Sequence, residues 1–147
     1  MLPDEAAEAL LRQTLASYAA DPIQGDFILQ VACAQAADPL PLYRTLYKFY
    51  NRQRRFDLAM DFAQRALAEA VRQANLPADY SAWTRDRLAE VDPLVASQAL
   101  LALKAQAFIT LRGGDETGAS GFLEKLRELD PEDGSGVSVV LALAAAV

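Results

Sequence analysis

Five basic side chains lie close together in the sequence, with no acidic residue among them. They are Arg44, Lys48, Arg52, Arg54 and Arg55. The rest of the chain carries 9 basic and 20 acidic residues, a net charge of −11. Arg44, Lys48 and Arg52, which we call the basic row, are four residues apart, so on a helix they share one face and repel each other. We therefore expect the row to serve a purpose other than helix stability, and its cationic N–H donors are suited to binding carboxylates.

The chain offers few side chains for catalysis or for metal binding. It contains no His, the commonest general base and metal ligand, and Cys33 is its single cysteine. Without a His to activate it, this Cys is predicted to be a small buried hydrophobic side chain. Residues 113–120 resemble a phosphate-binding loop in their spacing, but Ala119 stands where that loop requires Lys. We expect a non-enzymatic protein without a metal or a cofactor.

Composition indicates a folded protein that is not built to bind nucleic acid. Of 147 residues, 52% are hydrophobic and 23% are charged, with a net charge of −6. Binding to phosphate backbones needs a basic surplus, which this chain lacks. The N-terminal residues have no secretory signal pattern, and the longest apolar stretch, residues 137–147, is shorter than the roughly 20 residues that span a bilayer. These features predict a cytoplasmic protein that binds neither nucleic acid nor membrane.

The elements that must position the basic row are predicted to be helices. Good helix formers dominate the chain, and no segment keeps the two-residue alternation of a strand. Asp-Pro pairs and a Gly pair divide the sequence into helix-length pieces. We predict seven helices, over residues 4–19, 26–36, 40–53, 56–74, 93–112, 115–129 and 135–146, with an irregular insertion over 75–92. Short links predict a single all-α domain, residues 1–147, built as an antiparallel stack of helical hairpins.

The apolar residues of each helix predict which face is buried. The predicted inward side chains of residues 26–36 are Phe27, Ile28, Val31 and Ala32. Those of residues 56–74 are Leu58, Ala59, Phe62, Ala63, Ala66 and Ala70. The small residues Gly118, Ala119 and Gly121 predict a close contact with residues 93–112. Trp83, in the insertion, is expected to pin that loop to the core.

Residues 42–70 resemble a tetratricopeptide repeat, a pair of antiparallel helices that occurs in stacks. The resemblance rests on large and small residues at the spacing of that family: Tyr43, Leu46, Tyr50, Phe56, Ala59, Ala66 and Leu67. Tyr47 and Val71 depart from the pattern, because the family prefers a small residue at the first position and Pro at the second. Residues 93–130 resemble a second, more degenerate repeat. The resemblance implies helix pairs over about 40–74 and 93–130.

Two short segments carry a second resemblance. Residues 47–57, YKFYNRQRRFD, and residues 129–136, LDPEDGSG, are similar to small proteins encoded in bacterial nitrogen-fixation gene clusters. This likeness implies a bacterial origin and assigns no role to any residue.

The tetratricopeptide resemblance also implies where a partner would bind. The groove-lining face of the first helix would carry the basic row with Thr45 and Asn51, and Tyr47 would lie at its edge. Such a groove would hold an acidic peptide or a C-terminal carboxylate through charge-assisted hydrogen bonds. We therefore predict a protein-interaction adaptor or assembly factor that binds its partner through Arg44, Tyr47, Lys48, Asn51 and Arg52. The alternative is a solvated face whose charges pair with acids on the helices predicted over residues 4–19 or 93–112.

The C-terminal sequence suggests a different function. Residues 135–146 are predicted to form a helix with almost no polar face. Such a helix must be buried against other helices, of the same chain or of another chain. One side would meet residues 115–129, and the other would meet residues 4–19 or a second copy of the chain. This pattern predicts a homodimer through residues 135–147. The alternative function is therefore a self-associating structural domain without a peptide groove.

Overall fold

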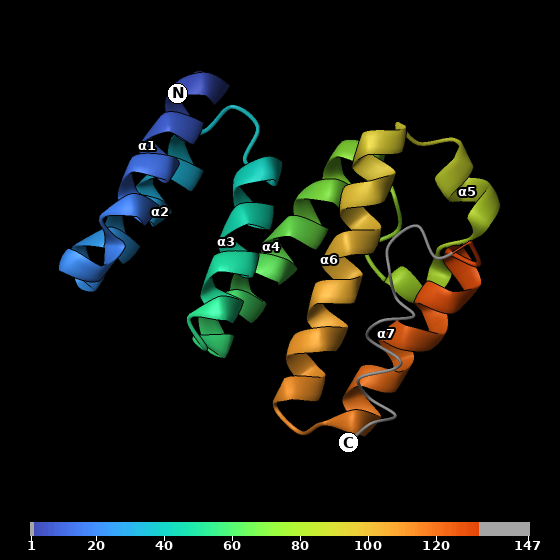
Figure 1. The fold of residues 1–147 in the computed structure, drawn as a ribbon. Helices are drawn as coiled ribbons and strands as arrows, with labels where there is room; N and C mark the ends of the chain where they lie inside the picture. Colours follow the sequence, from blue (N-terminus) through green and yellow to red (C-terminus); the bar gives the residue numbers. More distant parts are fainter. Residues whose placement is uncertain (1, 133–147) are drawn as a thin grey trace. The chain divides into compact units, whose positions relative to one another are not determined.

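The computed structural model describes residues 2–132, which contain seven α-helices and no β-strand (Figure 1). The predicted all-α class is confirmed. The helices are α1 (Asp4–Ala16), α2 (Pro22–Gln35), α3 (Leu40–Arg52), α4 (Phe56–Ala74), α5 (Arg85–Ala89), α6 (Pro93–Arg112) and α7 (Glu116–Leu129). The helix over 135–146 and the homodimer through 135–147 lie outside the described residues, and both stay predictions.

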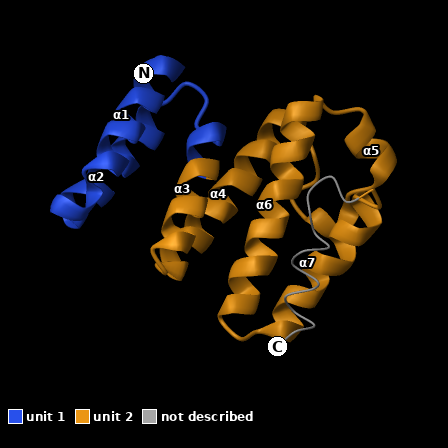
Figure 2. Ribbon diagram, viewed as in Figure 1, with its two compact units in different colours: residues 1–43 blue, residues 44–147 orange. Residues whose placement is uncertain are grey.

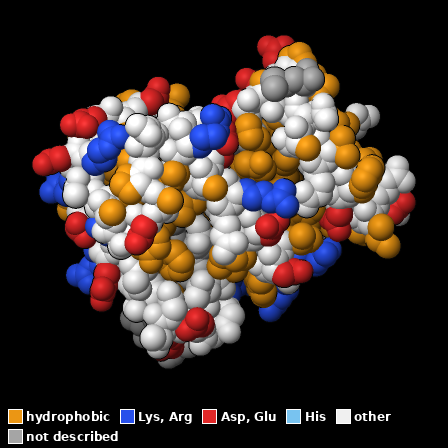
Figure 3. Space-filling model, turned by 180° about the vertical axis from the view of Figure 1, so that it is seen from behind, with side chains coloured by type: hydrophobic (Ala, Val, Ile, Leu, Met, Phe, Trp, Pro, Cys, Tyr) orange, Lys and Arg blue, Asp and Glu red, His pale blue; other side chains and the backbone are white. Residues whose placement is uncertain are grey.

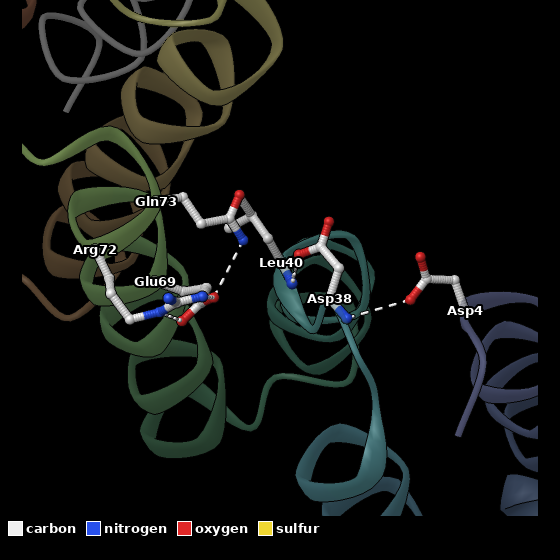
Figure 4. A network of polar contacts seen from close by, with 6 residues as sticks. All are labelled: Asp4, Asp38, Leu40, Glu69, Arg72 and Gln73. Atoms are coloured by element: carbon white, nitrogen blue, oxygen red, sulfur yellow. Dashed lines mark hydrogen bonds and ion pairs between the residues drawn. The ribbon is translucent and has the colours of Figure 1, made fainter. Parts of the chain in front are cut away.

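The helices form two compact units, and the boundary between them falls inside α3, after Tyr43 (Figure 2). Unit 1, residues 1–43, is a hairpin of α1 and α2 with a short 3₁₀ helix, Tyr18–Ala20, between them. The first and last residues of the hairpin are tied together. The Leu2 amide donates to the Gln35 carbonyl at 2.6 Å, and the Asp38 amide donates to Asp4 Oδ1 at 3.2 Å (Figure 4).

Helix α2 begins at Pro22, four residues before the predicted start at residue 26. Asp21 caps it, because its side chain accepts a hydrogen bond from the Gln24 amide at 3.2 Å. Pro22 occupies the first turn, where its missing N–H costs nothing. The Asp-Pro pair therefore starts this helix as well as ending the preceding segment. Helix α1 ends at Ala16, short of the predicted residue 19, and continues as the 3₁₀ turn.

The buried face of α2 differs from the prediction. Its buried residues are Gly25, Leu29, Ala32 and Cys33, whereas Phe27 and Val31 are exposed. Apolar residues occur on nearly every side of α2, so helical periodicity could not select one face. The buried face is determined instead by the close packing of Gly25 against Tyr18. A Cβ on Gly25 would lie 2.8 Å from the Tyr18 ring, so only glycine fits there without a shift of the ring. The Tyr18 hydroxyl also donates to Asp26 Oδ1 at 2.6 Å, which holds the ring against α2.

Unit 2, residues 44–147, contains α4, α6 and α7, which lie side by side and antiparallel (Figure 1). Helices α4 and α6 have the predicted bounds, residues 56–74 and 93–112. The predicted inward face of α4 is confirmed for five of its six residues, and Leu58 is half-buried. Four of the buried residues of α4 are Ala, which lets the neighbouring helix approach closely. The Tyr50 ring of α3 stacks on the Phe62 ring of α4 at 5.7 Å between centroids.

The insertion over residues 75–92 is held down as predicted. It contains a 3₁₀ helix, Tyr80–Ala82, and the short α5, which Thr84 caps by accepting from the Arg87 amide at 3.1 Å. Trp83 is 0% exposed, and its indole Nε1 donates to the Pro77 carbonyl at 2.7 Å. The Tyr80 ring stacks on Phe122 of α7 at 5.2 Å between centroids. The aromatic residues of this segment therefore anchor it to unit 2.

The predicted contact of three small residues of α7 with α6 is wrong for both glycines. Gly118 and Gly121 are exposed, and Ala119 is buried. Gly118 lies against the capping side chain of Asp115, and the Gly118 amide donates a hydrogen bond to Asp115 Oδ1 at 2.8 Å. A Cβ on Gly121 would lie 3.3 Å from the Tyr80 hydroxyl. The two glycines thus make room for a helix cap and for the insertion.

Helix α6 has the length and apolar composition of a membrane-crossing helix, and among the described helices it alone does. It contacts both α4 and α7, and its residues Ala99, Ala102 and Leu103 are fully buried. The core helix of a soluble protein meets the same criteria, so one such helix does not make the chain a membrane protein.

Candidate functional site

The basic row occupies one side of α3, within unit 2. Lys48 and Arg52 are exposed, and Arg44 is half-buried. In residues 2–132, no side-chain hydrogen bond or ion pair involves Lys48 or Arg52. The four-residue spacing therefore produces the shared charged face that the sequence predicted, with two cations left to solvent or to a ligand.

Four other basic residues of unit 2 differ from Lys48 and Arg52, because each forms an ion pair with an acid one turn away. The pairs are Arg65 with Asp61, Arg72 with Glu69, Arg87 with Glu90 and Lys125 with Glu128. Figure 4 shows one of them, in which Glu69 accepts hydrogen bonds from both Arg72 and Gln73. Lys48 and Arg52 are solvated, as the alternative interpretation of the row also expects, but neither pairs with an acid in the described part of the chain.

Tyr47 does not share the exposure of its neighbours in the row. Its side chain is 5% exposed, although the sequence placed it at the edge of the partner-binding face. Burial raises the pKa of the Tyr47 phenol to about 12, an effect that the positive charge of Arg44 partly offsets. The ring is therefore a neutral part of the packing beneath the row, and the surface available to a partner consists of the polar side chains.

Asn51 connects the row to a cation that the sequence prediction missed. Its Oδ1 accepts a hydrogen bond from Arg112 Nη1, at the end of α6, at 3.3 Å. The Arg112 guanidinium lies 4.7 Å from the centroid of the Phe56 ring and 5.7 Å from that of Phe108. These contacts hold a flexible side chain in one place. Asn51 and Arg112 are 61 residues apart in the chain, so no local spacing could have brought them together.

The turn after α3 adds further arginines beside Asn51. Helix α3 ends at Arg52, and Arg54 reverses the chain with a left-handed backbone, φ 62°. The Arg55 amide donates to the Tyr50 carbonyl at 2.9 Å, which closes the turn. Arg52, Arg54 and Arg55 are all exposed. Arg112 contacts Asn51 and Phe56, which lie on the two sides of this turn, so it lies at the same end of the α3–α4 pair as the three arginines.

The chemistry available to this site is hydrogen-bond donation with positive charge. Arg and Lys side chains donate and do not accept, so they select anionic or carbonyl oxygens. The Asn51 amide adds an N–H₂ group, for which the described residues contain no partner. Within residues 2–132, no three His, Cys, Asp or Glu side chains lie close enough to hold a metal ion.

Comparison with known proteins adds no family to this description. No family model, no curated protein and no solved structure matches the chain. The resemblances to tetratricopeptide repeats and to proteins of nitrogen-fixation clusters therefore stay predictions.

Proposed function

We propose that the chain is a non-enzymatic protein-interaction adaptor or assembly factor that binds an acidic or carboxylate-bearing segment through the basic row. One observation carries this proposal. Lys48 and Arg52 are exposed on one helix face, and neither has an acidic partner in the described residues. Four-residue spacing of like charges costs helix stability, so a ligand that neutralises them would gain from their arrangement.

The side chains around the row divide the recognition of such a segment between them. Arg52 presents a planar fork that matches a carboxylate, and Lys48 presents a compact positive charge. Asn51 keeps its N–H₂ group for a peptide carbonyl while its Oδ1 is held by Arg112. Arg112 in turn is fixed over Phe56, so it would lose little conformational freedom when an anion binds.

The fold is compatible with a tetratricopeptide-like stack. The hairpin of α3 and α4 is followed by α6 and α7, and successive long helices of unit 2 pack against each other. Ala59 and Ala119, the small residues expected in the two repeats, are both 0% exposed. We also propose that the chain is cytoplasmic and that it can form a homodimer through residues 135–147, which is the contact that the alternative, a self-associating structural domain, would use.

Binding of a labelled acidic peptide tests the proposal. The probe is a Glu- and Asp-rich peptide with a free C-terminal carboxylate, and the readout is fluorescence anisotropy with the full chain. Reversing both exposed cations, Lys48→Glu with Arg52→Glu, should weaken binding at least about tenfold, since each charged hydrogen bond contributes about 1.5–3 kcal/mol before screening. Added salt should weaken binding to the wild type as well.

A matched variant separates the row from general charge. Arg85→Glu with Arg127→Glu reverses two other exposed cations of unit 2 and changes the net charge equally. We expect this control to alter binding by no more than about twofold, because surface charges at a distance are screened. Equal losses in the two variants would mean that the row has no special role. Far-ultraviolet circular dichroism must show the same helix content in both.

A further inference from the structure

Helix α2 exposes a stripe of large apolar side chains that the rest of unit 1 leaves uncovered. Ile23 is 84% exposed, Phe27 68% and Val31 39%. Because they are four residues apart, they lie on one face, along about 12 Å of helix. Among the described residues, the other large hydrophobic side chain with comparable exposure is Leu94, in unit 2. Figure 3 shows one face of the molecule, on which hydrophobic side chains reach the surface with both basic and acidic side chains between them.

A hollow adjoins this stripe. A cleft of about 350 Å³ lies between the end of α1 and the start of α2, and its lining includes Leu10, Tyr18, Gln24 and Ile28. Gln24 and Ile28 each follow a stripe residue in the sequence, so they lie about 100° further round α2. An apolar ridge beside an open cleft is the kind of surface on which the apolar side of another helix packs.

The charge of unit 1 determines which helix would fit. Residues 1–43 contain one basic residue, Arg12, and six acidic residues: Asp4, Glu5, Glu8, Asp21, Asp26 and Asp38. Two copies of this unit would repel each other, which disfavours symmetric pairing through α2. Residues 133–147 of the chain contain no basic residue and cannot complement this charge either. A partner helix with basic side chains flanking an apolar face would both cover the apolar stripe and complement the negative charge of unit 1.

We propose that α2 of unit 1 is a docking surface for a basic amphipathic helix of a partner protein. Its apolar residues would cover Ile23, Phe27 and Val31, and Ile28 in the cleft would extend that contact. Asp21, which is exposed and lines the same cleft, offers a carboxylate to a Lys or Arg of the partner. This surface is independent of the basic row, since it lies in the other unit and selects the opposite charge.

Two synthetic helices provide the probe. The first is a labelled peptide of about 18 residues with Leu on one face and Lys on the other, and the second has Glu in place of Lys. The full chain should bind the Lys peptide at least about tenfold more tightly than the Glu peptide, because like charges oppose the second complex. Equal binding of both peptides, or binding of neither, would overturn the proposal.

Variants then locate the binding surface. Ile23→Ser with Phe27→Ser should weaken binding of the Lys peptide at least about tenfold, as expected for buried apolar anchors. Leu94→Ser, at a residue that is 78% exposed in unit 2, is the matched control and should leave the affinity within about twofold. An unchanged affinity in the double variant would refute the assignment to α2. If light scattering showed a wild-type dimer that the double variant dissociates, a second copy would be the occupant and the proposal would be wrong.

Discussion

Replacing Trp83 tests whether one buried side chain holds the insertion of unit 2 in place. The indole is 0% exposed, and its Nε1 donates to the Pro77 carbonyl at 2.7 Å. Trp83→Phe removes that hydrogen bond, which contributes about 1 kcal/mol. The smaller ring leaves part of the site empty, at a further cost of about 1 kcal/mol. We therefore expect the free energy of unfolding to fall by about 2 kcal/mol, and by about 3–5 kcal/mol for Trp83→Ala.

Urea unfolding of the full chain measures this loss. Circular dichroism follows the variants, and in the wild type the emission of the single tryptophan reports the same transition. A buried indole should emit as in an apolar environment and shift to that of an exposed indole when urea unfolds unit 2. If circular dichroism and tryptophan emission give the same urea transition, the insertion and the helices unfold together, as a two-state transition requires.

Tyr80→Phe is the matched control, since it lies in the same segment. It removes a hydroxyl that has no hydrogen-bond partner in the described residues and keeps the stack on Phe122. Its effect should stay within about 0.5 kcal/mol. A Trp83→Phe variant as stable as this control would refute the reasoning, and so would a wild-type emission that urea does not change.

Two further predictions concern the dependence of stability on pH. Burial raises the pKa of Tyr47 from 10.0 to about 12, so the folded state favours the neutral phenol. The contribution of Tyr47 to the free energy of unfolding is therefore complete below pH 10 and is lost as the pH rises toward 12. Tyr47→Phe should remove this alkaline loss in urea titrations and the latest step of the phenolate absorbance titration. The hydrogen bond from Arg72 lowers the pKa of Glu69 below 4.5, so its contribution is complete above that value and is lost as the pH falls through the lowered pKa. Glu69→Gln should flatten the acid side of the stability curve relative to the wild type.

Sequence patterns predicted the fold best where several local signals agreed. Helix α6 begins at Pro93 and is capped by Asp92, whose side chain accepts the Leu94 amide at 2.8 Å. Helix α4 combines a strong apolar face with a left-handed Asn75 that ends it. Each boundary is fixed by residues within one turn of it, so a local pattern contains the necessary information.

The face of α2 and the full candidate site required contacts that no local pattern contains. On α2 the choice of buried face depends on how Tyr18 fits against Gly25, which the spacing of apolar residues does not encode. In the candidate site, the four-residue spacing of the basic row predicted a shared face. It did not predict that Arg112 would join Asn51, because that contact depends on how α6 packs in unit 2.

The two proposed surfaces carry opposite charge preferences, which makes their separation testable. The row with Lys48 and Arg52 would attract acidic segments, and the α2 stripe with Ile23 and Phe27 lies in a unit of net charge −5. One simple ligand cannot satisfy both, so a chain that uses both surfaces would connect two different partners. The variants of each surface should then act on one ligand only. Reversal of the row should leave the Lys peptide bound, and loss of the stripe should leave the acidic peptide bound. If either variant abolished both interactions, the chain would have a single binding surface, and the adaptor model with two partners would be wrong.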